Sequence, residues 1–172
     1  MTTQQSIELL NELVKSSKEN EWIEFKLNFH SEEEIGQRIS ALSNGARINN
    51  QRYGYLVFGI ENETHIIKGT TFSARKHKKG NEELESWLAT RLNPRIDFSI
   101  HEFNYDDNRH ITMFVIPAAK IQPVEFLHTS YIRVGSITRK LGDFPEKQAK
   151  IWKKDTIPFE KEIAKNTGAR HQ

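Results

Sequence analysis

The stretch that decides the fold reads Tyr53-Gly54-Tyr55-Leu56-Val57-Phe58-Gly59-Ile60. It is a nearly continuous apolar run, bounded by Gln51-Arg52 before it and Glu61 after it. A run of this length without polar alternation is typical of a strand buried on both faces of a sheet. We therefore expect a central strand here and read the neighbouring segments as elements packed around it.

Upstream, residues 22–26 alternate with the period of a strand. Ile23 and Phe25 share one face, whereas Glu24 and Lys26 project from the other. If the two apolar side chains are buried, the acid and the lysine lie together on the opposite side. They are either a structural ion pair or a metal ligand beside a phosphate-binding cation.

Helices are predicted where apolar side chains recur on one face. Ser31 followed by three glutamates is an N-cap with acids in the first turn, and that helix is expected to stop near Asn44-Gly45. A polar loop over 46–52 would follow it. The other predicted helices span 5–17, Leu84 to the residues before Pro94, and Pro145 to Trp152.

Further strands follow from alternation and turn residues. A short partner strand is expected at 65–69, and two hairpins are expected, one joining 96–101 to 111–116 and one joining 124–127 to 131–134. The resulting order predicts a single α/β domain with a mixed sheet and helices packed on it. The expected divisions are a helix at 1–18, the main domain at 19–152 and a polar tail at 153–172.

Composition limits the classes of protein. The chain has 172 residues, 36% hydrophobic and 28% charged, which is within the range of a folded domain. It has no cysteine, which excludes disulfides and thiolate metal sites. No apolar run approaches the length of a membrane span, so we expect a cytoplasmic protein with no membrane partner.

The charge gives a local rather than a global signal. The formal net charge is only +2, so bulk electrostatics do not indicate a nucleic-acid-binding protein. The cations instead cluster at Arg75-Lys76-His77-Lys78-Lys79. On composition alone, a solvated loop explains such a run better than a phosphate-binding site.

Two enzyme signatures fail on their chemistry. Gly54 and Gly59 have the spacing of the first half of a P-loop, but Ile60 and Glu61 stand where lysine and serine or threonine are required. We therefore expect no ATP hydrolysis and assign these glycines to close backbone packing. The seven histidines are scattered without the spacing of a metal site.

Carboxylates give a stronger candidate. Glu61 ends the apolar strand, and Glu24 lies on the predicted neighbouring segment. Three acids from Glu19, Glu24 and Glu61 converging on one sheet edge would form an oxygen-rich site suited to Mg²⁺ or Mn²⁺.

Several blocks in order resemble the Schlafen-type, Alba-like domain family. They are Glu19-Asn-Glu-Trp-Ile-Glu-Phe-Lys26, Ile39-Ser-Ala-Leu-Ser-Asn44, Tyr55-Leu-Val-Phe-Gly-Ile-Glu61, Pro123-Val124 and Tyr131-Ile-Arg-Val-Gly-Ser136. Their order is more specific than any single block, and they cover roughly residues 19–152. The resemblance implies an α/β nucleic-acid-binding domain, as in bacterial transcriptional regulators.

The resemblance also implies an enzymatic alternative. Some eukaryotic relatives are metal-dependent ribonucleases that cleave tRNA and rRNA, and their catalytic acids would correspond to Glu19, Glu24 and Glu61. Glu61 replaces the usual Asp, and a polar insertion follows Gly45. Those nucleases form a cleft from two tandem copies, so a single copy would need a homodimer to rebuild it.

We therefore expect a nucleic-acid-binding domain whose partner is DNA or RNA. The alternatives are a metal-dependent endoribonuclease acting on tRNA or rRNA, an ATP-binding module and a protein-interaction domain. Arg133 and Tyr131 share a strand face, an arrangement suited to single-stranded bases. The expected phosphate contacts are Lys26, Arg75, Lys76, Lys78, Lys79, Arg133 and Arg139.

Overall fold

The computed structural model describes residues 1–16 and 20–153. The helices in this part are α1 (Thr3–Leu13), α2 (Glu32–Ile48), α3 (Leu84–Ala89), the 3-10 helix η1 (Leu141–Asp143) and α4 (Pro145–Trp152). The strands are β1 (Ile23–Lys26), β2 (Tyr53–Phe58), β3 (Lys78–Lys79), β4 (Glu82–Glu83), β5 (Leu92–Asn93), β6 (Ser99–Asp106), β7 (Arg109–Pro117), β8 (Glu125–Phe126), β9 (Thr129–Val134) and β10 (Ile137–Lys140). The predicted tail lies outside the described residues.

The apolar run forms the centre of a four-stranded sheet of order β1-β2-β7-β6. β1 is parallel to β2, whereas β7 is antiparallel to both β2 and β6, so the sheet is mixed as predicted. β6 is one edge of the sheet and β1 the other. Both predicted hairpins are present, as β6–β7 and β8–β9.

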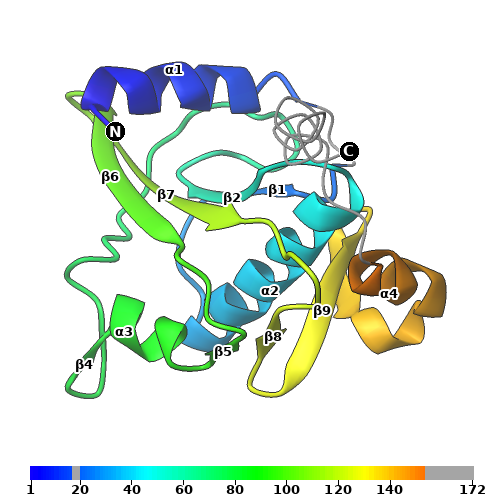
Figure 1. Cartoon of the computed structure of the whole chain (residues 1–172). Helices are drawn as coiled ribbons and strands as arrows, with labels where there is room; N and C mark the ends of the chain where they lie inside the picture. Colours follow the sequence, from blue (N-terminus) through cyan, green and yellow to red (C-terminus); the bar gives the residue numbers. More distant parts are fainter. Residues whose placement is uncertain (17–19, 154–172) are drawn as a thin grey trace, which may run out of the picture.

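The helices and a second sheet build layers on this sheet (Figure 1). α1 lies across one face, where Leu10 and Leu13 share a core with Val57 and Met113. α2 covers the opposite face and separates the first sheet from the second, whose order is β10-β9-β8-β5. A larger core of phenylalanine, leucine and isoleucine side chains fills the space around α2. The fold is the predicted α/β class, with α1 packed as part of it.

Polar side chains inside the larger core fix α2 to the second sheet. Asn44 is fully buried, and its amide nitrogen donates to the carbonyl oxygens of Val124 at 3.1 Å and Tyr131 at 2.8 Å. Its side-chain oxygen accepts from the Val124 amide at 2.8 Å. Ser40, one turn earlier, donates to the same Val124 carbonyl at 2.6 Å. These bonds satisfy the backbone groups of Val124, which precedes β8, and the carbonyl of Tyr131 in β9.

α2 extends beyond its predicted end. Its N-cap is Ser31 as expected, with the hydroxyl accepting from the Glu34 amide. The helix passes through Asn44-Gly45 and ends at Ile48, so the predicted loop over 46–52 is wrong in its first half. Gly45 is required for close approach instead, because a Cβ there would lie 2.2 Å from the carbonyl oxygen of Glu21.

Three other boundaries also differ. The predicted helix from Leu84 ends at Ala89, and Leu92 instead pairs with Phe126 as strand β5. The predicted strand at 65–69 is reduced to a single bridge between Ile60 and Ile67. The alternation at 96–101 becomes regular strand only from Ser99. In each case sheet pairing, which local sequence does not encode, sets the boundary.

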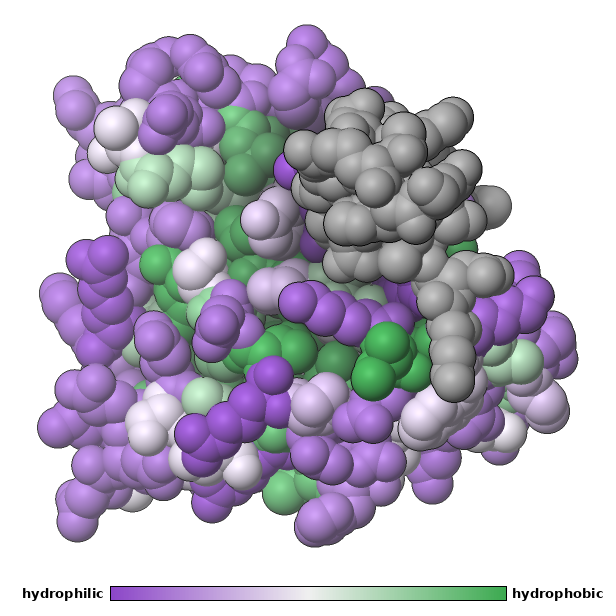
Figure 2. Space-filling view, viewed as in Figure 1, coloured by the Kyte–Doolittle hydropathy of each residue, from purple (hydrophilic) through white to green (hydrophobic). Residues whose placement is uncertain are grey.

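The outer surface is largely polar on the face shown in Figure 2, with apolar side chains gathered towards its centre. None of the helices in the described residues is long and apolar enough to cross a bilayer.

Candidate nucleic-acid interface

Glu24 is buried in an ion-pair cluster between β1, α2 and β9. Its side chain is 9% exposed, and its carboxylate lies 2.9 Å from Arg38 Nε and 3.5 Å from Arg133 Nε. The prediction that Glu24 and Lys26 share a face is confirmed, since both reach α2. They do not pair with each other, because Lys26 contacts Glu34 at 2.7 Å. In this arrangement cations neutralise the Glu24 carboxylate.

Arg133 holds β9 to β1. The residue is 2% exposed, and its Nη1 donates to the backbone carbonyl oxygens of Asn20 and Ile23. Burial lowers the pKa of its guanidinium, while the Glu24 carboxylate acts in the opposite direction. This burial corrects the prediction that Arg133 contacts phosphate beside Tyr131, because the side chain points into the protein.

Among the described residues, Glu61 does not form a metal site with Glu24. Glu61 follows β2 and pairs with Lys68 at 2.5 Å, which lowers the pKa of the Glu61 carboxyl. The register of β1 and β2 places Glu24 opposite Leu56, five residues before Glu61. Glu19 lies outside the described part of the chain. Within that part, no three histidine or carboxylate side chains are grouped so that they could hold a metal ion.

The basic loop, which is the segment 75–79 and ends in the short strand β3, is anchored to the edge strand β6 by a buried acid. The Glu102 side chain is 6% exposed and accepts from the Arg75 amide at 2.9 Å and the Thr112 hydroxyl at 3.2 Å. His110 Nε2 lies 3.1 Å from Oε1 of Glu102, the oxygen that also accepts from Thr112, whereas the Arg75 amide donates to Oε2. Burial alone would raise the pKa of Glu102, but bonds from Arg75, Ser73, His110 and Thr112 outweigh it and hold that pKa below its usual range. The backbone of the loop is therefore fixed to β6 at Arg75.

The five-residue cluster contains a cation that pairs with acidic side chains and cations that face solvent. Lys79 pairs with Glu32 at 3.1 Å and with Glu33 at 3.5 Å, and the Glu32 hydrogen bond raises the pKa of Lys79. Lys76 and Lys78 are exposed, and no ion pair with another described residue involves either of them. The Arg75 side chain is 75% exposed and lies 3.9 Å from Glu102. Three cations, Arg75, Lys76 and Lys78, thus face solvent.

A polar hollow of about 500 Å³ adjoins these cations. Its lining residues are Thr70, Thr71, Ser73, Arg75, Lys76, Glu102, Phe103, Asn104 and His110. Hydroxyls, an imidazole and two basic side chains at one surface provide donors for phosphate oxygens. The remaining predicted contact, Arg139, is exposed on β10 in the second sheet.

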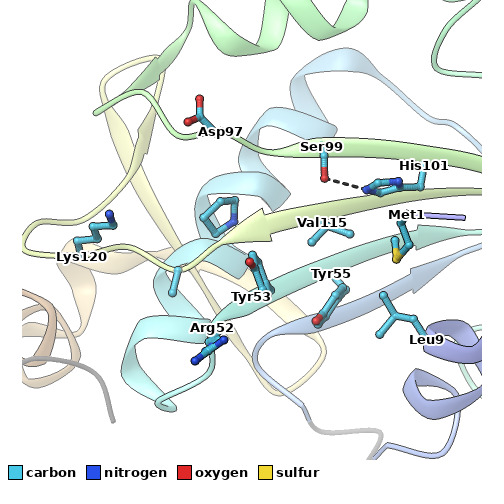
Figure 3. Close-up of a pocket in the computed structure, with 12 residues that line it drawn as sticks. Met1, Leu9, Arg52, Tyr53, Tyr55, Asp97, Ser99, His101, Val115 and Lys120 are labelled. Atoms are coloured by element: carbon cyan, nitrogen blue, oxygen red, sulfur yellow. Dashed lines mark hydrogen bonds between the residues drawn. The ribbon is translucent and has the colours of Figure 1, made fainter. Parts of the chain in front are cut away.

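A second surface was not predicted from the sequence. Tyr53 and Tyr55 project from β2 into a cavity of about 650 Å³ on the face of the first sheet that α1 covers only in part (Figure 3). Arg52 and Lys120 also line the cavity. The sequence feature that would have predicted it is the spacing of two residues between the tyrosines in the apolar run, because side chains two residues apart in a strand lie on one face.

Comparison with known proteins agrees with the fold and the sequence motifs. Residues 19–142 match the family model described as Schlafen, AlbA_2, which is more than half of the chain. The chain belongs to the Schlafen, AlbA_2 family.

Among solved structures, this AlbA_2 domain is similar to the DIP2311 protein from Corynebacterium diphtheriae. The identity is 17% and the TM-score 0.49, over 80% of this chain and 30% of that one. The AlbA_2 chain therefore spans about 30% of the length of that protein. No curated protein matches it.

The glycines with P-loop spacing have structural roles in this AlbA_2 domain. Gly54 lies within β2, where a Cβ would come 2.6 Å from the carbonyl oxygen of Leu42 on α2. Gly59 ends the strand with φ +113° and packs against Gly69. The segment between them is hydrogen-bonded to β1 and β7, so it is not a loop whose amides surround phosphate.

Proposed function

We propose that this AlbA_2 domain binds nucleic acid, DNA or RNA, through backbone phosphates, with Arg75, Lys76 and Lys78 as the principal contacts. The observation that carries the proposal is the anchored loop that presents these three cations to solvent. Membership of the Schlafen, AlbA_2 family supports the same class of partner.

Local charge, rather than net charge, is what this proposal requires. Phosphate contacts draw their free energy from released counterions, and a few well-placed lysines or arginines provide it even on a nearly neutral protein. The Glu102 anchor reduces the conformational entropy lost on binding, because the loop backbone at Arg75 is already fixed.

The test compares two variants that lose the same charge. Arg75, Lys76 and Lys78 are replaced together by Ala, and the control replaces the exposed Lys15, Lys150 and Lys153 by Ala. Binding of a fluorescently labelled 20-mer, single-stranded or duplex, is measured by anisotropy at several salt concentrations. Each lost phosphate contact lowers the slope of log affinity against log salt by about 0.7–0.9, so the loop variant should lose about 2–3.

The control variant should keep a slope close to that of the wild type. Equal slopes for the loop variant and the wild type would assign the loop to solvent and remove it from the interface. Binding that is lost equally in both triple variants would show a response to total charge rather than to this surface.

The ribonuclease hypothesis depends on Glu19, Glu24 and Glu61 and stays a prediction. Its direct test is cleavage of tRNA by the purified chain with Mn²⁺, stopped by EDTA. The Glu24 ion pairs favour binding over catalysis, because two guanidinium groups occupy the carboxylate that a metal would need.

A further inference from the structure

The open half of the first sheet is a platform built by three strands. The registers place Tyr55 of β2 opposite Val115 of β7, and Val115 opposite Ser99 of β6, so the three side chains form one row. Tyr53 and Pro117 form the next pair. α1 covers this face in part: Tyr55 and Val115 pack against the core that α1 shares with the sheet, and Met1 and Leu9 line the cavity in Figure 3 together with these rows.

The exposed chemistry of the platform is aromatic and cationic. Tyr53 is 42% exposed, and its ring centroid lies 6.4 Å from that of Tyr55 with an interplanar angle of 53°. Arg52 and Lys120 are exposed at the rim, and Asp97 is the one acidic side chain among the lining residues. Bases stack on aromatic rings, and the adjoining phosphates pair with nearby cations.

The platform and the basic loop meet across the edge strand β6. Ser99 and His101 line the platform on one face, and Glu102, which anchors Arg75, points to the other. Ser99 and Glu102 are separated by about 10 Å along an extended strand. Burial is the main cause that lowers the pKa of His101, and the N-terminal amine and the charge of Arg75 act in the same direction.

The geometry points to the platform as a site for unpaired bases: Tyr53 and Tyr55 stack bases of a single-stranded segment whose backbone continues over β6 to Arg75 and Lys76. This inference rests on the proposed function and specifies its substrate as single-stranded nucleic acid. In a duplex the faces of the bases are already stacked on one another, so a duplex can use the basic loop but not the tyrosines.

The test uses the whole chain, a labelled 12-nucleotide oligothymidine and a duplex of the same length. Tyr53→Ala should weaken oligothymidine binding about tenfold, while Tyr53→Phe keeps the ring and should stay close to the wild type. Duplex binding should change less than about twofold in both variants. Trp152→Ala, which removes an exposed aromatic side chain on α4, is the matched control and should change neither affinity.

A second measurement does not depend on affinity. Oligonucleotides carrying 5-iodouracil should crosslink under ultraviolet light to Tyr53 or Tyr55, as mapped by mass spectrometry. Unchanged oligothymidine binding in Tyr53→Ala, together with loss of binding in the triple loop variant, would overturn the platform and leave the proposed function standing. Absence of binding to either nucleic acid by the wild type would overturn both. Dimerisation that Tyr53→Ala abolishes without affecting oligonucleotide binding would assign the face to a second copy of the chain.

Discussion

Replacing Glu24 by Gln removes the charge that neutralises two arginines in the protein interior. The Arg133 side chain is 3% exposed and the Arg38 side chain 18% exposed, at 3.5 Å and 2.9 Å from the carboxylate. Removing one partner of a buried ion pair costs about 3–5 kcal/mol. Arg133 keeps its bonds to two backbone carbonyls, and Glu21 also favours its charged form, so we expect a loss of about 3 kcal/mol.

The loss is measured by urea unfolding followed through tryptophan fluorescence. The midpoint should fall while the slope against urea stays constant, because a change in stability alone does not alter the surface exposed on unfolding. A loss of about 3 kcal/mol corresponds to a fall in Tm of about 6–12 °C for a domain of this size. Glu61→Gln is the control, since its Lys68 partner is half exposed, and it should leave the midpoint unchanged.

A metal-binding role for Glu24 predicts the opposite behaviour. Grouped carboxylates repel one another, so Glu24→Gln would then raise stability in the absence of metal. Millimolar Mn²⁺ would raise the Tm of the wild type and leave the variant unchanged. That pair of results would refute the ion-pair account of Glu24.

Three further predictions use the same unfolding measurements. Asn44→Ala should cost at least about 2 kcal/mol, because it removes the acceptor of the buried Val124 amide and the donor to the Tyr131 carbonyl, and a variant as stable as the wild type would show that water replaces the side-chain amide. Gly54→Ala should cost about 1–3 kcal/mol, because its Cβ would lie 2.6 Å from the Leu42 carbonyl, and an unchanged midpoint would contradict the close approach. The pKa of Glu102 lies below its ordinary value of 4.5, so the stability that its charged carboxylate contributes is present above that pH and is lost as the pH falls through the lowered pKa. Between about pH 5 and pH 3, the Tm of Glu102→Gln should therefore fall less than that of the wild type. Equal falls in Tm would contradict this role of Glu102.

Local sequence signals predicted the elements that depend on local chemistry. The Ser31 cap, both hairpins and the α4 helix beginning at Pro145 follow from capping, turn and proline rules that act within a few residues. The predictions that were wrong concern residues whose role depends on contacts distant in the sequence. Gly45 resembled a helix stop, but its role is set by the backbone of Glu21, which no local rule anticipates.

The candidate site also combines features that local sequence predicts with features that depend on tertiary contacts. The cation cluster at 75–79 was visible in the sequence, but only the structure shows that Lys79 is paired and that Glu102 anchors the loop. Alternation placed Arg133 on a strand face without revealing that the face is buried. The sequence did not reveal the tyrosine platform, because the exposure of Tyr53 and Tyr55 depends on how far α1 covers the sheet, and this is set by the tertiary structure.

The most direct test of the nucleic-acid interface is an amide chemical-shift titration by NMR, with a 12-nucleotide single strand added to the isotopically labelled chain. We predict that the largest shifts fall on residues 74–78 and on the strand positions around Tyr53 and Ser99, while the amides of α4 stay unchanged. Shifts confined to β10 and α4, or no shifts at low salt, would contradict the assignment of the interface to the basic loop and the open half of the sheet.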